Sequence, residues 1–262
     1  MAEAPALVKM SKVSVLILRA PGTNCDGETA FAFQQAGATT SLVHINQLIR
    51  GEQRLSHYQI IVIPGGFTYG DVIAAGRVLA NELKLKLGED IHRFIENGGL
   101  ILGICNGFQV LVKAGILPPA DGTPRVTLGT NDSGRFECRW VHLRVNKDSR
   151  CVFTQGMDSL YLPVAHGEGK FIADPEVLPG LDIVLHYTDE SGNRAGYPHN
   201  PNGSANNIAG ICDSSGRIFA LMPHPERHIR GTQHPQWTRY GAKKYGDGFK
   251  IFQNAVSWAQ NL

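Results

Sequence analysis

Three short and nearly unbroken apolar runs constrain the fold of this chain more than any other feature. They span residues 13–20 (VSVLILRA), 59–64 (QIIVIP) and 99–104 (GLILGI). A strand that is apolar throughout is buried on both faces, which is typical of a parallel sheet covered by helices. Helical segments lie between the runs, so we expect an α/β fold with a mostly parallel sheet.

The helices between these runs are marked at their ends. Asp26 is expected to be an N-cap, and the helix that follows it ends before Gly37. Residues 91–95 carry an i, i+3, i+4 apolar pattern that ends at Gly98. Residues 39–45 are expected to form a further strand of the sheet.

Functional sites in such sheets form at the carboxyl ends of the strands. This rule points to residues 64–66 and 104–106, which directly follow two of the apolar runs. These two segments are therefore the first places to look for chemistry.

The second half of the chain changes character. Segments 136–145, 159–164 and 182–188 are expected to be strands separated by loops, and 206–222 to be two strands joined by an Asp-Ser-Ser-Gly turn. A last amphipathic helix is expected over 248–260. We interpret this half as an antiparallel addition to the same domain, which would cover 13–262 after an N-terminal extension of residues 1–12.

The composition excludes several classes of protein. The 262 residues are 42% hydrophobic and 18% charged, with a net charge of +2, so no electrostatic bias toward nucleic acid or a membrane surface is present. The opening segment lacks the pattern of a secretory signal, and the apolar runs are too short to cross a bilayer. Five scattered cysteines without a CxxC pair argue against a disulfide framework and a zinc site. A cytoplasmic enzyme with reduced thiols is expected.

Cys105 lies in the pattern of a nucleophile elbow. Gly103 and Gly107 flank it at two residues on either side, after a buried strand and before a helix. This turn is tight, and the flanking glycines allow the backbone to approach its neighbours closely while the nucleophile is exposed at the sheet edge. The start of the helix favours a thiolate at this point. The alternative is a buried core cysteine without chemistry.

A base and an orienter for such a thiol are present near the C-terminal end. His224 and Glu226 alternate with prolines, which we expect to hold the segment extended so that both side chains project to one side. Glu226 would then fix the tautomer of His224. A metal site formed with His228 is disfavoured because the spacing is not HExxH. No metal is therefore expected. A strand-terminal histidine satisfied by its neighbours is the remaining alternative.

Acyl transfer also needs donors for an oxyanion. The backbone N–H groups of Asn106, at the start of the helix, and of Gly66, at the neighbouring strand end, are the candidates.

These residues together resemble the class I (triad) glutamine amidotransferases. The matching positions are Gly103, Cys105, Gly107 and Gln109 of a G-x-C-x-G-x-Q elbow, with a distant H-P-E at 224–226. The resemblance implies a flavodoxin-like three-layer sandwich with a central, mostly parallel sheet and an added antiparallel region. It also implies Cys105, His224 and Glu226 as a catalytic triad.

Longer segments resemble, more narrowly, the glutaminase subunits of phosphoribosylformylglycinamidine (FGAM) synthases of purine biosynthesis. These segments are PGGFTYGD (64–71), GICNGFQ (103–109), GRFECRWV (134–141), AHGEGKF (165–171) and YPHNPNGSANNIAGICD (197–213). The resemblance implies that a thioester forms on Cys105. The released ammonia passes to a large synthetase subunit that converts formylglycinamide ribonucleotide (FGAR) to FGAM. A small third subunit is a further candidate partner.

The same resemblance assigns the remaining sites. Gln109, His166 and Gly167 would help to hold glutamine, with ordinary loop chemistry as the alternative for His166. The chain has no GxxxxGK[ST] loop. No cofactor is therefore expected on it, and ATP and Mg²⁺ are expected on the synthetase.

Three other functions remain open from the residues. The same scaffold could serve another synthase or act as a lone cysteine hydrolase. A non-catalytic interaction subunit could keep the fold, although all the triad residue types are present here. A flavodoxin-like electron carrier would rest on fold analogy alone and would be yellow.

Overall fold

The central feature of the computed structural model, which describes residues 12–119 and 124–262, is one mixed sheet of nine strands. Its order is β2-β1-β3-β4-β11-β10-β9-β6-β7, and the first five strands are parallel. These five are β2 (Thr39–His44), β1 (Ser14–Arg19), β3 (Ile60–Ile63), β4 (Leu100–Ile104) and β11 (Ile218–Leu221). The expected parallel sheet is confirmed. Most of the N-terminal extension expected over 1–12 lies outside the described residues.

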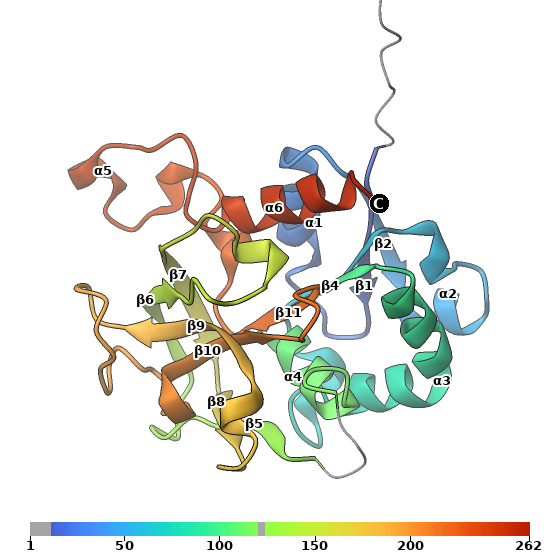
Figure 1. The fold of residues 1–262 in the computed structure, drawn as a ribbon, viewed down its shortest axis with the longest axis horizontal. Helices are drawn as coiled ribbons and strands as arrows, with labels where there is room; N and C mark the ends of the chain where they lie inside the picture. Colours follow the sequence, from blue (N-terminus) through green and yellow to red (C-terminus); the bar gives the residue numbers. More distant parts are fainter. Residues whose placement is uncertain (1–11, 120–123) are drawn as a thin grey trace, which may run out of the picture.

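The added antiparallel region continues the same sheet. The strands β10 (Ile208–Cys212), β9 (Asp182–Thr188), β6 (Glu137–Val145) and β7 (Ser159–His166) extend it from β11, each antiparallel to its neighbour. A separate antiparallel pair is formed by β5 (Val126–Thr130) and β8 (Glu168–Ala173). In Figure 1 this pair lies below the larger sheet.

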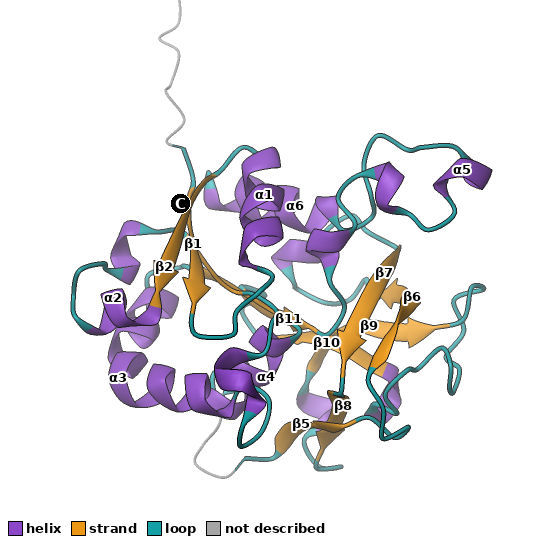
Figure 2. Cartoon of the chain, turned by 180° about the vertical axis from the view of Figure 1, so that it is seen from behind, coloured by secondary structure: helices purple, strands orange, loops and turns teal. Residues whose placement is uncertain are grey.

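Helices cover both faces of the parallel half (Figures 1 and 2). One layer contains α1 (Asp26–Gln35) and α6 (Phe249–Ala259). The two helices are in contact through the edge-to-face rings of Phe33 and Phe252, whose centroids lie 5.0 Å apart. The other layer contains α3 (Arg77–Glu96) and α4 (Asn106–Ala114), with the short α2 (Ile45–Ile49) beside them. The three-layer sandwich expected from the sequence is confirmed.

Burial explains why the central strands are apolar at every position. All residues of β3, β4, β10 and β11 are buried, because the strands lie inside the sheet with helices or chain on both faces. In the strands β6 and β7, by contrast, buried residues alternate with more exposed ones, so each strand has one more exposed face. The core is therefore thickest where β3, β4 and β11 lie side by side, and the site residues follow these strands.

The expected N-cap at Asp26 is wrong. The cap position is Cys25, and Asp26 is the first helical residue. Its carboxylate pairs instead with Arg19 Nε at 2.7 Å. An acidic side chain in the first turn is still favourable to the helix dipole, which explains why the pattern resembled a cap.

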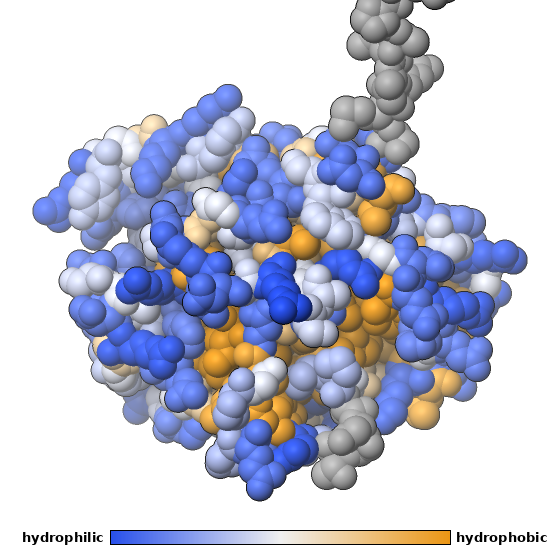
Figure 3. Space-filling view, in the orientation of Figure 1, coloured by the Kyte–Doolittle hydropathy of each residue, from blue (hydrophilic) through white to orange (hydrophobic). Residues whose placement is uncertain are grey.

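Figure 3 shows a largely hydrophilic face, with hydrophobic residues visible mainly toward its middle. Within the described ranges, no helix has the length and apolar character needed to cross a membrane.

Candidate active site

Cys105 occupies a strained turn between β4 and α4. Its backbone is in the left-handed region, with φ +52°, which is costly for a residue other than glycine. The flanking glycines are sterically required: a Cβ on Gly107 would lie 1.9 Å from Ile63 O, and one on Gly103 would lie 2.6 Å from Leu111 Cδ1. The chain therefore has the geometry of a nucleophile elbow.

His224 and Glu226 form a buried pair after β11. Glu226 Oε1 lies 2.6 Å from His224 Nδ1, and the two residues are 1% and 2% exposed. The His224 backbone is extended and its N–H donates to Pro163 O at 2.8 Å. The expectation of an extended segment through Glu226 is wrong, because residues Pro225–Arg227 form a 3₁₀ turn. The turn, which begins at Pro225, directs the Glu226 carboxylate back toward the His224 imidazole.

Electrostatics favour a protonated imidazole in this pair. Burial of His224 opposes protonation, but the charge of Glu226 and then Cys105 outweigh it and hold the pKa of His224 well above its ordinary value. Arg227 lies near the carboxylate as well, with Nε 3.9 Å from Glu226 Oε1. An imidazolium next to a thiol is the arrangement that stabilises a thiolate.

Cys105 and His224 open into one cavity of about 250 Å³. Its lining consists of Asn24, Cys25, Gly66, Phe67, Cys105, Phe136, Ala165, His224 and Arg227. His224 Nε2 has no hydrogen-bond partner among the described residues, and it is the nitrogen not used by Glu226. The free nitrogen is thus available for proton transfer at the cavity.

Both expected oxyanion donors lie beside this cavity. Gly66 lines it, and neither its N–H nor that of Asn106 donates to any group in the part of the chain that the structure describes. Gly66 has φ +151°, and a Cβ there would lie 2.8 Å from Gly22 O, so glycine is needed. Phe67 N–H donates to Gly22 O at 2.9 Å, which fixes the turn carrying Gly66.

The side chain of Asn106 ties the elbow to the loop after β3. Its Oδ1 accepts from Thr68 Oγ1 at 2.6 Å, and its Nδ2 donates to Asp71 Oδ1 at 3.3 Å and Gln109 Oε1 at 2.9 Å. This buried network fixes the position of the segment after β3, which carries Gly66, relative to the start of α4, which carries Asn106.

The residues expected to bind glutamine lie just outside the cavity lining. Gln109 is 3% exposed, and its amide donates to Glu168 O and accepts from Asn106. His166 is buried with Nδ1 3.1 Å from Asn131 Oδ1, and Gly167 O accepts from Asn131 N–H at 3.0 Å. These residues are held by hydrogen bonds next to the cavity lining, and their role toward glutamine stays a prediction.

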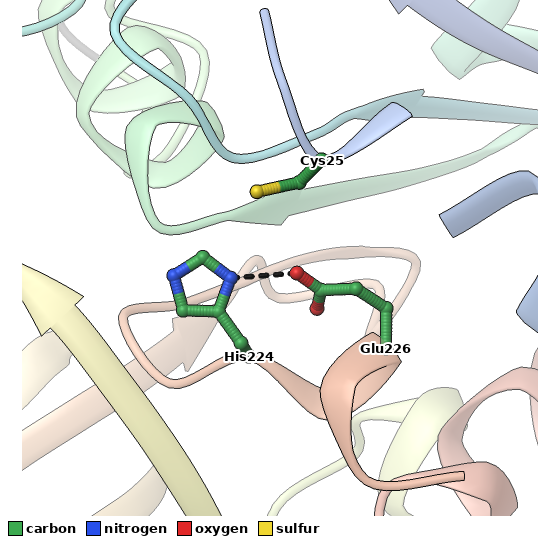
Figure 4. Close-up of side chains that lie close together, drawn as sticks. All are labelled: Cys25, His224 and Glu226. Atoms are coloured by element: carbon green, nitrogen blue, oxygen red, sulfur yellow. Dashed lines mark hydrogen bonds and ion pairs between the residues drawn. The ribbon is translucent and has the colours of Figure 1, made fainter. Parts of the chain in front are cut away.

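Cys25 and Arg227 are site residues that sequence reasoning did not identify. Arg227 Nη2 donates to Cys25 Sγ at 3.0 Å, and both residues line the cavity. The signal was present, because Cys25 follows β1 and the carboxyl ends of parallel strands meet at one edge. His228, by contrast, places its Nδ1 2.8 Å from Tyr161 O. The group of ligand-type atoms around His224 is completed by Cys25 (Figure 4).

Comparison with known proteins gives a consistent result. The CobB/CobQ-like glutamine amidotransferase domain matches residues 12–259. A phosphoribosylformylglycinamidine synthase subunit PurQ of Dehalococcoides mccartyi is 62% identical over 255 residues, covering 97% of this chain and 100% of the relative. One of Archaeoglobus fulgidus is 44% identical over 274 residues, covering 96% and 98%. A chain in the structure of PurLQS from Thermotoga maritima matches with a TM-score of 0.73 and 32% identity, covering 94% and 99%. The chain therefore belongs to the CobB/CobQ-like glutamine amidotransferase family.

Proposed function

We propose that this chain is the glutaminase subunit of FGAM synthase and releases ammonia from glutamine for a synthetase subunit. One observation supports the chemistry most strongly. Cys105 on a strained elbow shares a cavity with His224, whose other nitrogen is held 2.6 Å from Glu226. The relatives named as FGAM synthase subunits support the acceptor.

The proposed reaction has two halves. The Cys105 thiolate attacks the side-chain amide carbon of glutamine, and His224 gives its Nε2 proton to the departing ammonia. A γ-glutamyl thioester remains on Cys105. His224 then takes a proton from water, which attacks the thioester and releases glutamate and the thiol. Glu226 stabilises the imidazolium in both halves.

The oxyanion of each tetrahedral intermediate would accept from the N–H groups of Gly66 and Asn106. Gln109, His166 and Gly167 are proposed to shape the glutamine site from positions next to the cavity lining. We also propose that residues 13–262 act as one domain, because strands from both halves of the chain share one nine-stranded sheet.

The proposed partner is the large synthetase subunit, which would carry ATP, Mg²⁺ and FGAR, with a small third subunit in the complex. Ammonia must reach FGAR without escaping to water, so the partner should cover the mouth of the cavity. Exposed apolar side chains are present there: Phe67 and Phe136 line the cavity and are 46% and 52% exposed. Val72 and Ile73 follow Phe67 closely in sequence and are 80% and 73% exposed. These four residues, named here the mouth patch, are proposed to contact the synthetase.

The expected cytoplasmic location also stays part of the proposal. It is consistent with all five cysteines being free, since disulfides persist mainly in oxidising compartments.

Substitution of Cys105 by Ala tests the proposed chemistry. The complex with a synthetase subunit should lose glutamine-dependent amidine formation and keep formation driven by ammonium chloride. Cys138, an exposed thiol on β6, is the matched control, and Cys138→Ser should keep both rates. Survival of the glutamine-dependent rate in Cys105→Ala would overturn the assignment.

A further inference from the structure

A compact group of three metal-ligand side chains shares two residues with the proposed triad. One ligand atom each of Cys25, His224 and Glu226 lies within 4.8 Å of the other two, and all three residues are buried. They come from two distant segments, the loop before α1 and the turn after β11 (Figure 4). In Figure 4 the Cys25 sulfur lies beside the His224–Glu226 hydrogen bond.

The surroundings of the group suit a bound cation in two respects. Glu226 Oε2 is buried and has no hydrogen-bond partner among the described residues, so the carboxylate has an unused acceptor. Arg227 Nη2 donates to Cys25 Sγ at 3.0 Å, and N–H donors of this kind support metal-bound thiolates from outside the ligand set. Glu28, 3.6 Å from Arg227 Nε, balances the charge of the guanidinium.

We propose that Cys25, His224 and Glu226 form an inhibitory site for a thiophilic divalent cation, with Zn²⁺ as the fitting ion. Thiolate, imidazole and carboxylate are the three side-chain ligands that zinc takes in proteins. Tetrahedral zinc would place the imidazole nitrogen and the carboxylate oxygen about 3.3 Å apart. They are 2.6 Å apart here, so this pair must separate by less than about 1 Å, and the Cys25 sulfur, which lies within 4.8 Å of both atoms, must come to about 3.6 Å from each.

Binding would remove the base from the reaction, a consequence that rests on the proposed function. Zn²⁺ replaces the Nδ1 proton of His224 and the thiol proton of Cys25, and both protons leave to solvent. The ring then keeps its remaining proton on Nε2, so it can accept none from Cys105 or water.

The metal itself is tested on the isolated full chain. Cys105→Ala removes the other thiol of the cavity, and calorimetric titration of this variant with ZnCl₂ should show one bound ion per chain. Adding Cys25→Ser should weaken that binding by more than about tenfold, since the loss of a ligand exceeds the cost of an outer-sphere change. Adding Cys138→Ser instead should leave it unchanged, because Cys138 is exposed and outside the group.

A second measurement identifies the ligand. Co²⁺ in the Cys105→Ala protein should give a thiolate-to-cobalt charge-transfer band that Cys25→Ser removes. No bound ion, or binding and a band that survive Cys25→Ser, would overturn the site.

Inhibition is tested in the complex with the synthetase subunit. Zn²⁺ should suppress the glutamine-dependent rate, spare the ammonia-dependent rate, and be reversed by EDTA. Cys25→Ser, normalised to its own metal-free rate, should need more than about tenfold more Zn²⁺. Equal sensitivity of the two proteins would overturn the inhibitory role. A complex without any glutamine-dependent rate would instead contradict the proposed function, while the titrations still decide the metal site.

Discussion

Glu226 Oε1 lies 2.6 Å from His224 Nδ1 inside the protein; His224 directly precedes a 3₁₀ turn, and Glu226 lies within that turn. The contact fixes which imidazole nitrogen faces Cys105. Replacement of the carboxylate by a neutral amide keeps the shape and removes the charge that stabilises the imidazolium.

We therefore predict that Glu226→Gln lowers kcat for glutamine hydrolysis by about 10³–10⁴-fold, as when the buried carboxylate of a comparable triad becomes an amide. Steady-state glutamate release in the complex measures this. Glu176→Gln, at an exposed carboxylate paired with Arg125, is the control and should leave kcat unchanged. A fall of less than about tenfold in Glu226→Gln would contradict the assigned role.

Gly107 tests the steric basis of the elbow. A Cβ there would lie 1.9 Å from Ile63 O, which belongs to the backbone of β3 and cannot move away cheaply. We predict that Gly107→Ala lowers the free energy of unfolding by about 3 kcal/mol, the upper end of the usual cost of overpacking, in urea titrations. Gly88→Ala is the control: this glycine in α3 has open space around its Cβ position, and alanine should stabilise the helix by about 0.5–1 kcal/mol. Similar midpoints for the two variants would contradict the close approach.

His166 makes stability depend on pH. Burial and then the charge of His224 lower its pKa from the ordinary 6.5 to about 4. The unfolded chain binds a proton here below pH 6.5 and the folded chain only near pH 4, so this contribution to stability is full above pH 6.5 and is lost as pH falls toward 4. Between pH 7 and pH 5 the loss is about 2 kcal/mol.

His166→Asn should remove most of this pH dependence, because an asparagine side chain does not titrate. Its amide N–H can replace the Nδ1 donor to Asn131 Oδ1, so the hydrogen bond is kept. The measurement is the difference in unfolding free energy between pH 7 and pH 5, taken for both proteins in urea. Subtracting the value of the variant from that of the unchanged protein cancels the contribution of His224, which both proteins share. That contribution has the opposite sign and acts at higher pH, because the pKa of His224 is raised. An unchanged difference in the variant would show that His166 does not carry the effect.

The mouth patch makes a prediction about assembly. Val72→Asp places a charge on a side chain that is 80% exposed, and it should weaken association with the synthetase subunit by about tenfold or more. Leu85→Asp is the control, because Leu85 is 76% exposed but lies on α3, away from the cavity lining. Sedimentation of both variants with the partner measures the affinities. Equal weakening, or none, would place the interface elsewhere.

Much of this architecture was readable from local patterns. The fully apolar strands β3 and β4, and the two elbow glycines around Cys105, report burial and steric crowding that act within a few residues. The last turns of α3 were readable as well, because Ile91 and Phe94 lie at helical spacing and are buried, whereas the start of this helix at Arg77 was not predicted.

Other features depend on contacts that one segment does not encode. Cys25 contacts Arg227 across 202 positions of sequence, so the strand-end rule can place Cys25 at this edge of the sheet but does not identify Arg227 as its partner. The pairing of β5 with β8 is likewise set by where the chain returns, not by the strands themselves. The turn at Pro225 was misread because the flanking prolines exclude an α-helix but allow a 3₁₀ turn.

The most direct test of the central claim is glutamine-driven amidine formation. The purified chain is combined with a synthetase subunit, ATP, Mg²⁺ and FGAR, and FGAM is measured with glutamine or with ammonium chloride as the nitrogen source. The account predicts that the chain confers a glutamine-dependent rate that the synthetase alone lacks. A synthetase that binds this chain and uses ammonia, but ignores glutamine, would contradict it.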